Sequence, residues 1–151
     1  MRDIITEEQE KEIVEAIEQA EANTSGEIRV HIENTCQIET LDRAVEVFAA
    51  LHMHQTKLRN GVLFYVALKS HKFAVLGDAG INAVVPKNFW DEIKTHVLAA
   101  FKNGDYGKGL AEGILMAGEQ LRTYFPHDPE TDTNELHDHI SFGTDDDKDD
   151  K

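Results

Sequence analysis

Residues 59–69 read Arg-Asn-Gly-Val-Leu-Phe-Tyr-Val-Ala-Leu-Lys, and this stretch decides the fold. A polar start with a glycine leads into seven consecutive apolar residues, 62–68, which leave no polar face. Such a run is typical of a strand that is covered on both faces of its sheet. The polar turn at 69–72 and the second apolar run at 73–76 predict that an antiparallel strand follows directly.

The segment before this hairpin predicts a parallel neighbour for its first strand. Residues 27–33 alternate strictly between polar and apolar side chains, which is the pattern of a half-buried strand. The side chains expected to face the core are Ile28, Val30 and Ile32, and those expected to face solvent are Glu27, Arg29, His31 and Glu33. A helix expected at 40–56 connects the two strands, and a right-handed crossover makes them parallel.

Apolar residues at helical spacing predict helices on both faces of this sheet. The expected ranges are about 6–22, 40–56, 86–101 and 106–124. Thr6 and Gln9 form a capping-box pair at the start of the first helix. The residues of the second helix expected to face the core are Leu41, Ala44, Val45, Phe48 and Leu51. This order of elements predicts a three-layer α/β/α sandwich with a small mixed sheet, a parallel β-α-β unit plus an antiparallel hairpin strand.

The length and the charge limit the class of protein. A chain of 151 residues fits one domain, which we place at residues 1–127. The net charge is −14, and residues 128–151 carry ten acids and two lysines, a net charge of −8. The polar composition from His127 onward predicts disorder, with an extension at 128–143 and a disordered acidic tail or tag at 144–151. Neither part has the basic patch that nucleic acids or anionic membranes attract, so cations are the expected small partners.

The sequence also gives an expectation for the compartment. No run reaches the roughly 18 apolar residues of a membrane helix, and the N-terminus lacks the apolar segment of a secretory signal. We therefore expect a cytoplasmic protein that has no membrane segment and is a monomer. The single cysteine, Cys36, excludes a disulfide within the chain and is expected to be a buried free thiol.

Polar residues and glycines gather at one end of the expected strands. The first two strands begin at this edge, and the antiparallel third strand finishes there. The junctions that meet at the edge are residues 25–27, 59–61 and 77–80. Glu27 and Asp78 contribute carboxylates, and Asn60 contributes an amide oxygen. Oxygen ligands on glycine-containing loops suit Ca²⁺ or Mg²⁺, so the sequence predicts a divalent cation held by Asp78, Glu27 and Asn60.

Other interpretations of these residues stay open. Glycines at strand ends are often only turns, and an aspartate after a strand is often only the cap of the next helix. Ligands of parallel sheets usually bind beyond the carboxyl ends of the strands, which is the opposite edge. The residues expected at that second candidate edge are Asn34, Thr35, Cys36, the turn at 69–71 and Asp105.

Two histidine pairs, His52 with His54 and His137 with His139, are interpreted as solvated side chains. Side chains two residues apart in a helix point about 200° away from each other around the helix axis. His52 and His54 therefore cannot share an ion if residues 40–56 are helical. The second pair lies in the polar C-terminal region, where it would bind a transition metal only weakly.

Several segments together resemble the TPM domain family. They are Ser-Gly-Glu-Ile at 25–28, Asn-Gly-Val-Leu at 60–63, Ala-Val-Leu-Gly-Asp-Ala-Gly-Ile at 74–81 and Phe-Lys-Asn-Gly-Asp-Tyr-Gly-Lys-Gly-Leu at 101–110. Asn-Glu-Leu at 134–136 and Ile-Ser-Phe-Gly at 140–143 resemble the C-terminal signature of its short, soluble bacterial branch. The resemblance covers about residues 5–143.

This resemblance implies a three-layer α/β fold and, in some relatives, binding of divalent cations. Family members are commonly labelled phosphatases, and larger relatives with a signal peptide and a membrane anchor maintain membrane protein complexes. This sequence shows neither segment, so we do not transfer the latter role. The loop at 77–80 is shorter than the glycine-glutamate loop of the larger relatives, and His137 stands where this branch often has proline.

The favoured hypothesis is a divalent-cation-binding domain that acts as an interaction or regulatory module, with a protein as a second candidate partner. The alternative is a weak metal-dependent acid phosphatase, in which the same ion polarises a phosphoryl oxygen and activates water. Phosphoryl transfer normally uses several positive groups, and Arg59 is the only obvious phosphate clamp in the sequence near this edge, which favours the first hypothesis. A third hypothesis is a structural domain that binds a partner through its helical face.

Overall fold

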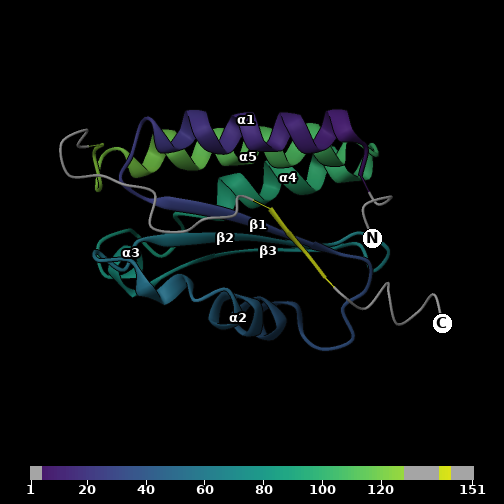
Figure 1. Cartoon of the computed structure of the whole chain (residues 1–151), viewed down its shortest axis with the longest axis horizontal. Helices are drawn as coiled ribbons and strands as arrows, with labels where there is room; N and C mark the ends of the chain where they lie inside the picture. Colours follow the sequence, from purple (N-terminus) through teal and green to yellow (C-terminus); the bar gives the residue numbers. More distant parts are fainter. Residues whose placement is uncertain (1–4, 128–139, 144–151) are drawn as a thin grey trace.

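The computed structural model describes residues 5–127 and 140–143, and within them it contains a single mixed sheet between helices. The helices are α1 (Glu7–Glu21), α2 (Thr40–Ala50), the 3-10 turn η2 (Met53–Gln55), α3 (Ala79–Asn82), α4 (Asp91–Lys102) and α5 (Tyr106–Leu121). The strands are β1 (Glu27–Glu33), β2 (Gly61–Ala67), β3 (Lys72–Gly77) and β4 (Ile140–Phe142). Helices α1, α4 and α5 cover one face of the sheet and α2 lies on the other (Figure 1). The predicted α/β/α sandwich is confirmed.

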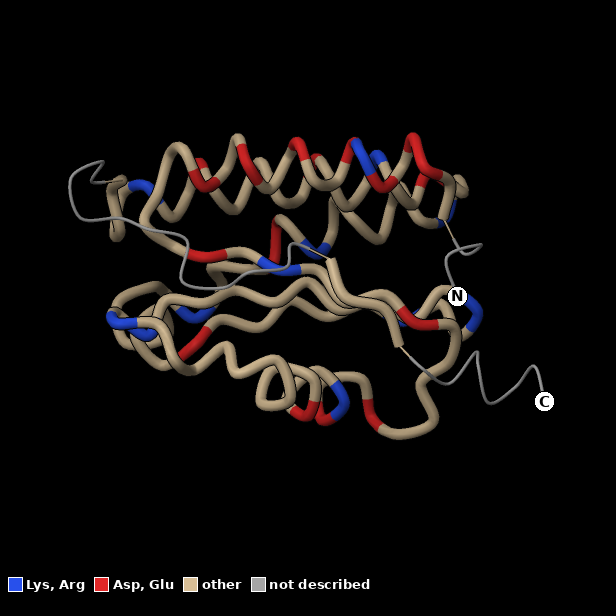
Figure 2. Tube along the Cα trace, in the orientation of Figure 1, with Lys and Arg blue, Asp and Glu red and all other residues tan. Residues whose placement is uncertain are grey.

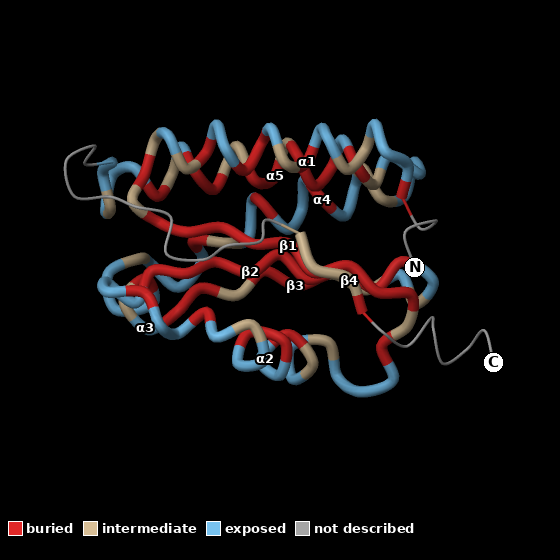
Figure 3. The backbone as a smooth tube through the Cα atoms, viewed as in Figure 1, coloured by how far each residue is buried: buried red, intermediate tan, exposed pale blue. Residues whose placement is uncertain are grey.

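The central strand is β2, as its uninterrupted apolar sequence predicts. The strand order is β3-β2-β1-β4. β2 pairs in parallel with β1, where Glu27 lies opposite Gly61, and antiparallel with β3, where Val62 lies opposite Gly77. Every residue of β2 is buried, because both neighbouring strands and both helical layers cover it (Figure 3). The predicted parallel unit and hairpin are therefore both present.

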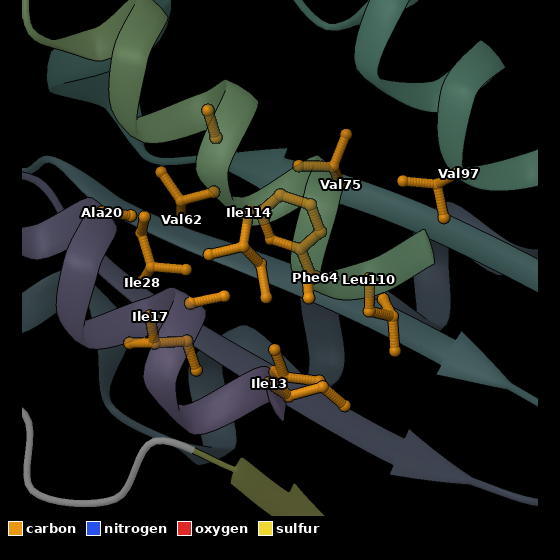
Figure 4. Close-up of a cluster of buried hydrophobic side chains, with 14 of the residues drawn as sticks. Ile13, Ile17, Ala20, Ile28, Val62, Phe64, Val75, Val97, Leu110 and Ile114 are labelled. Atoms are coloured by element: carbon orange, nitrogen blue, oxygen red, sulfur yellow. The ribbon is translucent and has the colours of Figure 1, made fainter. Parts of the chain in front are cut away.

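The larger core lies between the sheet and the layer of α1, α4 and α5. Figure 4 shows Ile13 and Ile17 of α1, Ile28 of β1, Phe64 of β2 and Ile114 of α5 meeting in this layer. A smaller cluster fills the α2 side, where alternate residues of β2 meet α2 and η2. Its members include Ala44, Val47, Phe48, Met53, Leu63, Tyr65 and Ala67.

Helix α1 begins as predicted. The Thr6 hydroxyl accepts from the backbone N–H of Gln9 at 3.0 Å, and the Gln9 side chain accepts from the backbone N–H of Thr6 at 2.8 Å. The reciprocal pair satisfies two backbone donors that the first turn leaves without helical partners.

The second helix differs from the prediction in length and in orientation. α2 ends at Ala50, and His52 takes a left-handed backbone conformation with φ 56° before the 3-10 turn η2. The buried face consists of Ala44, Val47 and Phe48, whereas Leu41 and Val45 are about half exposed. Ala44 and Phe48 therefore face the core as predicted, whereas Leu41 and Val45 do not, and Val47 takes their place in the buried face.

The prediction that the polar side chains of β1 face solvent is wrong. Glu27, Arg29, His31 and Glu33 are all buried, and so are the apolar residues that alternate with them. Strand alternation points the polar set toward the α2 side and the apolar set toward α1 and α5. β1 is thus covered on both faces, as strands of parallel units usually are.

Part of the polar C-terminal region is ordered. Ile140–Phe142 form β4, which pairs in parallel with β1, and Gly143 is buried. This corrects the prediction of disorder from His127 onward for these four positions. Residues 128–139 and 144–151, including the predicted acidic tail, lie outside the described residues.

Within the described residues, none of the helices has the length and the apolar character that crossing a bilayer would require.

Small residues let α5 approach α1 closely, which gives a test of the packing. A Cβ placed on Gly118 would lie 2.7 Å from the Cβ and 2.8 Å from the Cα of Ala20. Gly118→Ala should gain about 1 kcal/mol of helix propensity but lose about 1–3 kcal/mol from overpacking against the α1 backbone. We expect a net loss in the free energy of unfolding, measured in urea. Glu119→Ala, an exposed neighbour, should change it by less than about 0.5 kcal/mol.

Candidate functional site

The three junctions predicted to meet at one edge of the sheet do meet there. We call residues 25–27, 59–61 and 77–80 the rim. The backbone N–H of Asp78 donates to the carbonyl of Gly61 at 3.0 Å, and that of Glu27 donates to the carbonyl of Asn60 at 3.3 Å. Strand register thus places the start of β1, the start of β2 and the end of β3 side by side.

The close approach of the loops at the rim depends on one glycine. A Cβ placed on Gly80 would lie 2.1 Å from the carbonyl oxygen of Leu58, which no side chain could tolerate. The backbone N–H of Gly80 donates to the carbonyl of Arg59 at 2.9 Å, and Arg59 itself has a positive φ of 52°. The backbone of residues 58–60 therefore packs directly against the start of α3. Arg59 has a left-handed backbone conformation there, which residues other than glycine rarely adopt.

Asp78 lies at the centre of the rim and is bound by an arginine. Its Oδ2 accepts from Nε of Arg59 at 2.7 Å, and its Oδ1 accepts from Nη2 of Arg59 at 2.9 Å. Oδ1 also accepts from the backbone N–H of Ala79 at 2.7 Å, so Asp78 caps α3. The Asp78 side chain is 7% exposed and that of Arg59 is 50% exposed, so a buried anion is paired with a half-solvated cation. The hydrogen bonds and the charge of Asp78 raise the pKa of Arg59.

The other two predicted ligands are also buried at the rim. The Nδ2 of Asn60 donates to the hydroxyl of Ser25 at 3.3 Å, and its backbone N–H donates to the hydroxyl of Thr56 at 3.1 Å. Glu27 is buried and lies next to Gly61 in the strand register. Strand alternation puts the side chains of Glu27 and Asp78 on the α2 side of the sheet. Gly61, which has no side chain, lies between them.

The rim combines two carboxylates and one amide, which is a sparse set for a metal. In the part of the chain that the structure describes, there is no group of three or more His, Cys, Asp or Glu side chains arranged to hold an ion. Occupation of the rim by a cation therefore stays a prediction, and its ligands would have to include amide or carbonyl oxygens.

A second polar cluster lies near the opposite end of β1, on the same face. We call Glu33, His31, Arg43, Tyr65 and Ser141 the Glu33 cluster. The Glu33 carboxylate accepts from Nε and Nη2 of Arg43, both at 2.9 Å, and from the Tyr65 hydroxyl. His31 Nε2 lies 3.1 Å from Oε1 of Glu33, and His31 Nδ1 lies 2.7 Å from Oγ of Ser141.

The cluster keeps Glu33 ionised although it is buried. Burial raises the pKa of Glu33, but hydrogen bonds from Arg43, His31 and Tyr65 outweigh burial and hold the pKa at about 2. Burial and the hydrogen bond to Glu33 raise the pKa of Tyr65, so its hydroxyl keeps its proton and donates it to the carboxylate. An ionised Glu33 only accepts, so Nε2 of His31 carries a hydrogen and donates it to Oε1 of Glu33.

The order serine, histidine, carboxylate is also that of nucleophilic relays in hydrolases. Here His31 is 6% exposed and Glu33 is 2% exposed, so the relay is enclosed between strands and a helix. We interpret the cluster as a structural one that joins β4, β1, β2 and α2.

Sequence reasoning missed this cluster, although a signal for it was available. A strand with an all-apolar neighbour and helices on both sides is normally covered on both faces, so its charged residues should be buried and paired. The cluster lies near the second candidate edge, where the backbone N–H of Cys36 donates to the Ser70 hydroxyl at 2.9 Å. Cys36 is a buried free thiol, as expected.

The histidine pairs give no metal centre within the described residues. The rings of His52 and His54 are 6.4 Å apart between centroids and tilted by 58°. Both residues are exposed, which agrees with the prediction of solvated side chains. His137 and His139 lie outside the described residues.

Charges are unevenly distributed over the domain. Acidic residues recur along α1, including Glu7, Glu8 and Glu10 in its first turn (Figure 2). Acids near a helix N-terminus interact favourably with its dipole, so this feature is explained by helix stability alone.

The fold and the rim define a small α/β/α domain whose sheet combines a parallel pair with an antiparallel hairpin strand. The chain belongs to the TPM domain family, whose profile matches residues 1–120. It is similar to the BA42 protein from the psychrophilic bacterium Bizionia argentinensis, with 50% sequence identity. The alignment covers 92% of this chain and 95% of that chain, and the NMR structure gives a TM-score of 0.86.

More distant solved structures share the fold. The N-terminal domain of a P. gingivalis protein is 19% identical, with a TM-score of 0.66 and coverage of 82% of each chain. The N-terminal domain of the cg2496 protein from Corynebacterium glutamicum is 11% identical, with a TM-score of 0.62, over 90% of this chain and 79% of that chain. No curated protein matches this chain.

The Glu33 cluster gives a prediction about stability and pH. Glu33→Gln should lower the free energy of unfolding at pH 7 by about 2–4 kcal/mol, because it removes the charge of the buried carboxylate that pairs with Arg43 and His31. The pKa of Glu33 falls from 4.5 to about 2 on folding, so its contribution is complete above pH 4.5 and is lost as the pH falls toward 2. The difference between wild type and variant in urea unfolding should therefore shrink over that range.

Glu46→Gln is the matched control, because Glu46 also contacts Arg43, at 3.0 Å, but is mostly exposed. It should change the free energy of unfolding by at most about 0.5 kcal/mol at any pH. Equal effects of the two substitutions would show that the burial of Glu33 has no energetic consequence.

Proposed function

We propose that the chain is a cytoplasmic module that binds Ca²⁺ or Mg²⁺ at the rim through Asp78, Glu27 and Asn60 and thereby regulates an interaction with a protein partner. The pair between Asp78 and Arg59 is the observation that carries this proposal. A buried carboxylate with both oxygens on a guanidinium is already a site that selects a cation. A divalent ion would compete with Arg59 for the same oxygens.

The exposure of Arg59 makes this competition feasible. Its side chain is half exposed, so it can rotate into water without losing much packing. Asp78 cannot follow, because its backbone is held in the β3 ladder and its Oδ1 caps α3. An ion that replaces Arg59 leaves the fold intact and restores the missing charge next to a buried carboxylate.

Other groups that carry oxygen atoms lie around Gly61 at the rim. Glu27 and Asp78 are on the same side of the sheet, on the strands that flank Gly61. The carbonyl oxygen of Met53 lies over Gly61, only 3.0 Å from where a Cβ of that residue would be. Carboxylate, amide and carbonyl oxygens are the ligands that calcium uses, and calcium tolerates irregular geometry better than magnesium does. We therefore favour Ca²⁺ over Mg²⁺.

The alternative function, a weak metal-dependent acid phosphatase, would need Arg59 to contact the phosphate. Arg59 instead binds Asp78 in this structure, and nothing else at the rim favours turnover over binding. The proposal is therefore a binding module.

Calcium titration of the ¹⁵N-labelled chain tests the proposal. The amides of 25–27, 59–61 and 77–81 should shift together, with a Kd of about 10⁻⁴–10⁻³ M, as for weak calcium modules. Asp78→Asn should weaken binding at least about tenfold, because it removes a charged ligand. Shifts restricted to the acidic residues at 128–151 would contradict the proposal.

The competition with Arg59 has its own test. Arg59→Gln should tighten calcium binding by a few-fold, because the ion then no longer has to displace the guanidinium from Asp78. Lys108→Gln is the control: Lys108 is exposed and lies in the first turn of α5, whereas it is Leu121, at the other end of this helix, that approaches Gly26 of the rim. It removes the same charge from the molecule and should leave the Kd unchanged. Equal tightening by both variants would indicate only a change in overall charge.

A further inference from the structure

The middle of the chain is basic although the chain as a whole is acidic. Residues 47–90 contain five Lys and Arg residues but one acid, a net charge of +4, against −14 for the whole chain. The five cations are Lys57, Arg59, Lys69, Lys72 and Lys87. The one acid, Asp78, is buried and binds Arg59 with both carboxylate oxygens, so it adds little negative charge to the surface.

Three of these cations belong to the segments around α3, at the end of the sheet where the rim lies. Figure 2 shows Lys and Arg positions near α3. Lys57 and Arg59 belong to the loop that packs against α3, and Lys87 lies between α3 and α4. All three residues are exposed. Lys69 and Lys72 lie at the turn between β2 and β3, at the opposite end of the hairpin.

Two large apolar side chains are exposed in the same segments. Leu58 is 53% exposed and Val84 is 51% exposed. The carbonyl of Leu58 lies against Gly80 of α3, and Val84 comes one helical turn after Gly80. Residues one turn apart lie on the same face of a helix, so Val84 is on the side of α3 that meets the 58–60 loop. We call Lys57, Leu58, Arg59, Val84 and Lys87 the Arg59 surface.

The backbone of this surface is fixed, so its exposed side chains are held in place. The backbone N–H of Arg59 donates to the carbonyl of Thr56 at 3.1 Å, and its carbonyl accepts from Gly80 at 2.9 Å. The backbone N–H of Val84 donates to the carbonyl of Ile81 at 3.0 Å. A surface with a fixed backbone loses less conformational entropy when it binds a partner.

We propose that the Arg59 surface binds an acidic segment of a partner protein in which a carboxylate stands next to an apolar side chain, and that a divalent cation on Asp78 promotes this binding by releasing Arg59. The inference rests on the proposed cation site and names the partner that the site regulates. The partner's carboxylate takes the place of Asp78 on the guanidinium, with two parallel hydrogen bonds. Its apolar side chain covers Leu58 and Val84.

The distribution of charge favours a short protein segment over a larger polyanion. Outside residues 47–90 the chain carries 10 bases and 28 acids, a net charge of −18. At physiological salt, screening limits the attraction between charges to about 8 Å. A short segment on the Arg59 surface therefore meets mainly the local positive charge, whereas a membrane or a nucleic acid would also meet the surrounding acids.

A peptide titration of the full-length ¹⁵N-labelled chain tests the proposal. The probe is a blocked six-residue peptide with two glutamates, each next to a leucine. The amides of residues 57–59, 84, 85 and 87 should shift, and the Kd should fall by a few-fold when calcium saturates the rim at matched ionic strength. By linkage, the peptide should tighten calcium binding by the same factor, after correction for calcium bound by the peptide alone. The same peptide with glutamines in place of the glutamates should not bind.

Two substitutions separate this role from a structural one. Arg59→Gln should weaken peptide binding a few-fold and abolish its dependence on calcium, although it tightens calcium binding, whereas a merely structural Arg59 would weaken both. Val84→Ser should weaken peptide binding several-fold and leave calcium binding unchanged. Leu98→Ser is the matched control, because Leu98 is 40% exposed on α4, and it should change neither affinity.

The outcomes distinguish the inference from the proposed function. Calcium shifts at residues 25–27, combined with a peptide affinity that calcium does not change, would overturn the inference and leave the cation site in place. No calcium shifts at residues 25–27 would overturn both. Binding of phosphatidylserine vesicles but not of the peptide would also overturn the inference, because the occupant would then be a membrane.

Discussion

The burial of β2 on both faces is the constraint from which the rest of this structure follows. A strand whose seven residues are all buried must have a strand on each side and a helical layer on each face. β1 and β3 supply the strands, α1, α4 and α5 supply one layer, and α2 supplies the other. The positions of the rim and of the Glu33 cluster are then set by register, since each lies near one end of the strands that flank β2.

Double-sided coverage has a consequence for the polar residues of β1. Four polar side chains of β1 are buried, so their hydrogen-bonding and charged groups have to be satisfied inside the protein: Glu27, Arg29, His31 and Glu33. Glu33 meets this requirement with Arg43, Tyr65 and His31, and Ser141 of β4 completes the set. A hydrophobic face would have been easier to bury, and the polar face instead gives β1 a specific hydrogen bond to the serine of β4.

Much of this arrangement could be predicted from the sequence, because β2 and its hairpin are local signals. The apolar run at 62–68, the short turn and the alternation in 27–33 were sufficient for the strand directions and hence for the rim. The failures concern residues whose environment depends on distant partners. Glu33 looks solvated until Arg43 and Tyr65 are placed against it, and Leu41 looks buried until α2 is packed on the sheet with Val47 inward. Ile140–Phe142 look disordered until β1 offers an edge, because three residues carry no strand pattern of their own.

The two buried carboxylates that bind an arginine differ in whether that arginine can be replaced. Glu33 has donors on both oxygens from Arg43, Tyr65 and His31, and Arg43 is itself only one-third exposed. Without Arg43, the carboxylate of Glu33 would still accept from Tyr65 and from His31. Asp78 depends on Arg59 and a single backbone N–H, and Arg59 is half exposed. Burial alone therefore does not distinguish a binding site from a structural pair. The exposure of the partner is a better criterion, and by this criterion the pair at the rim is the one in which the arginine is freer to move away from its carboxylate.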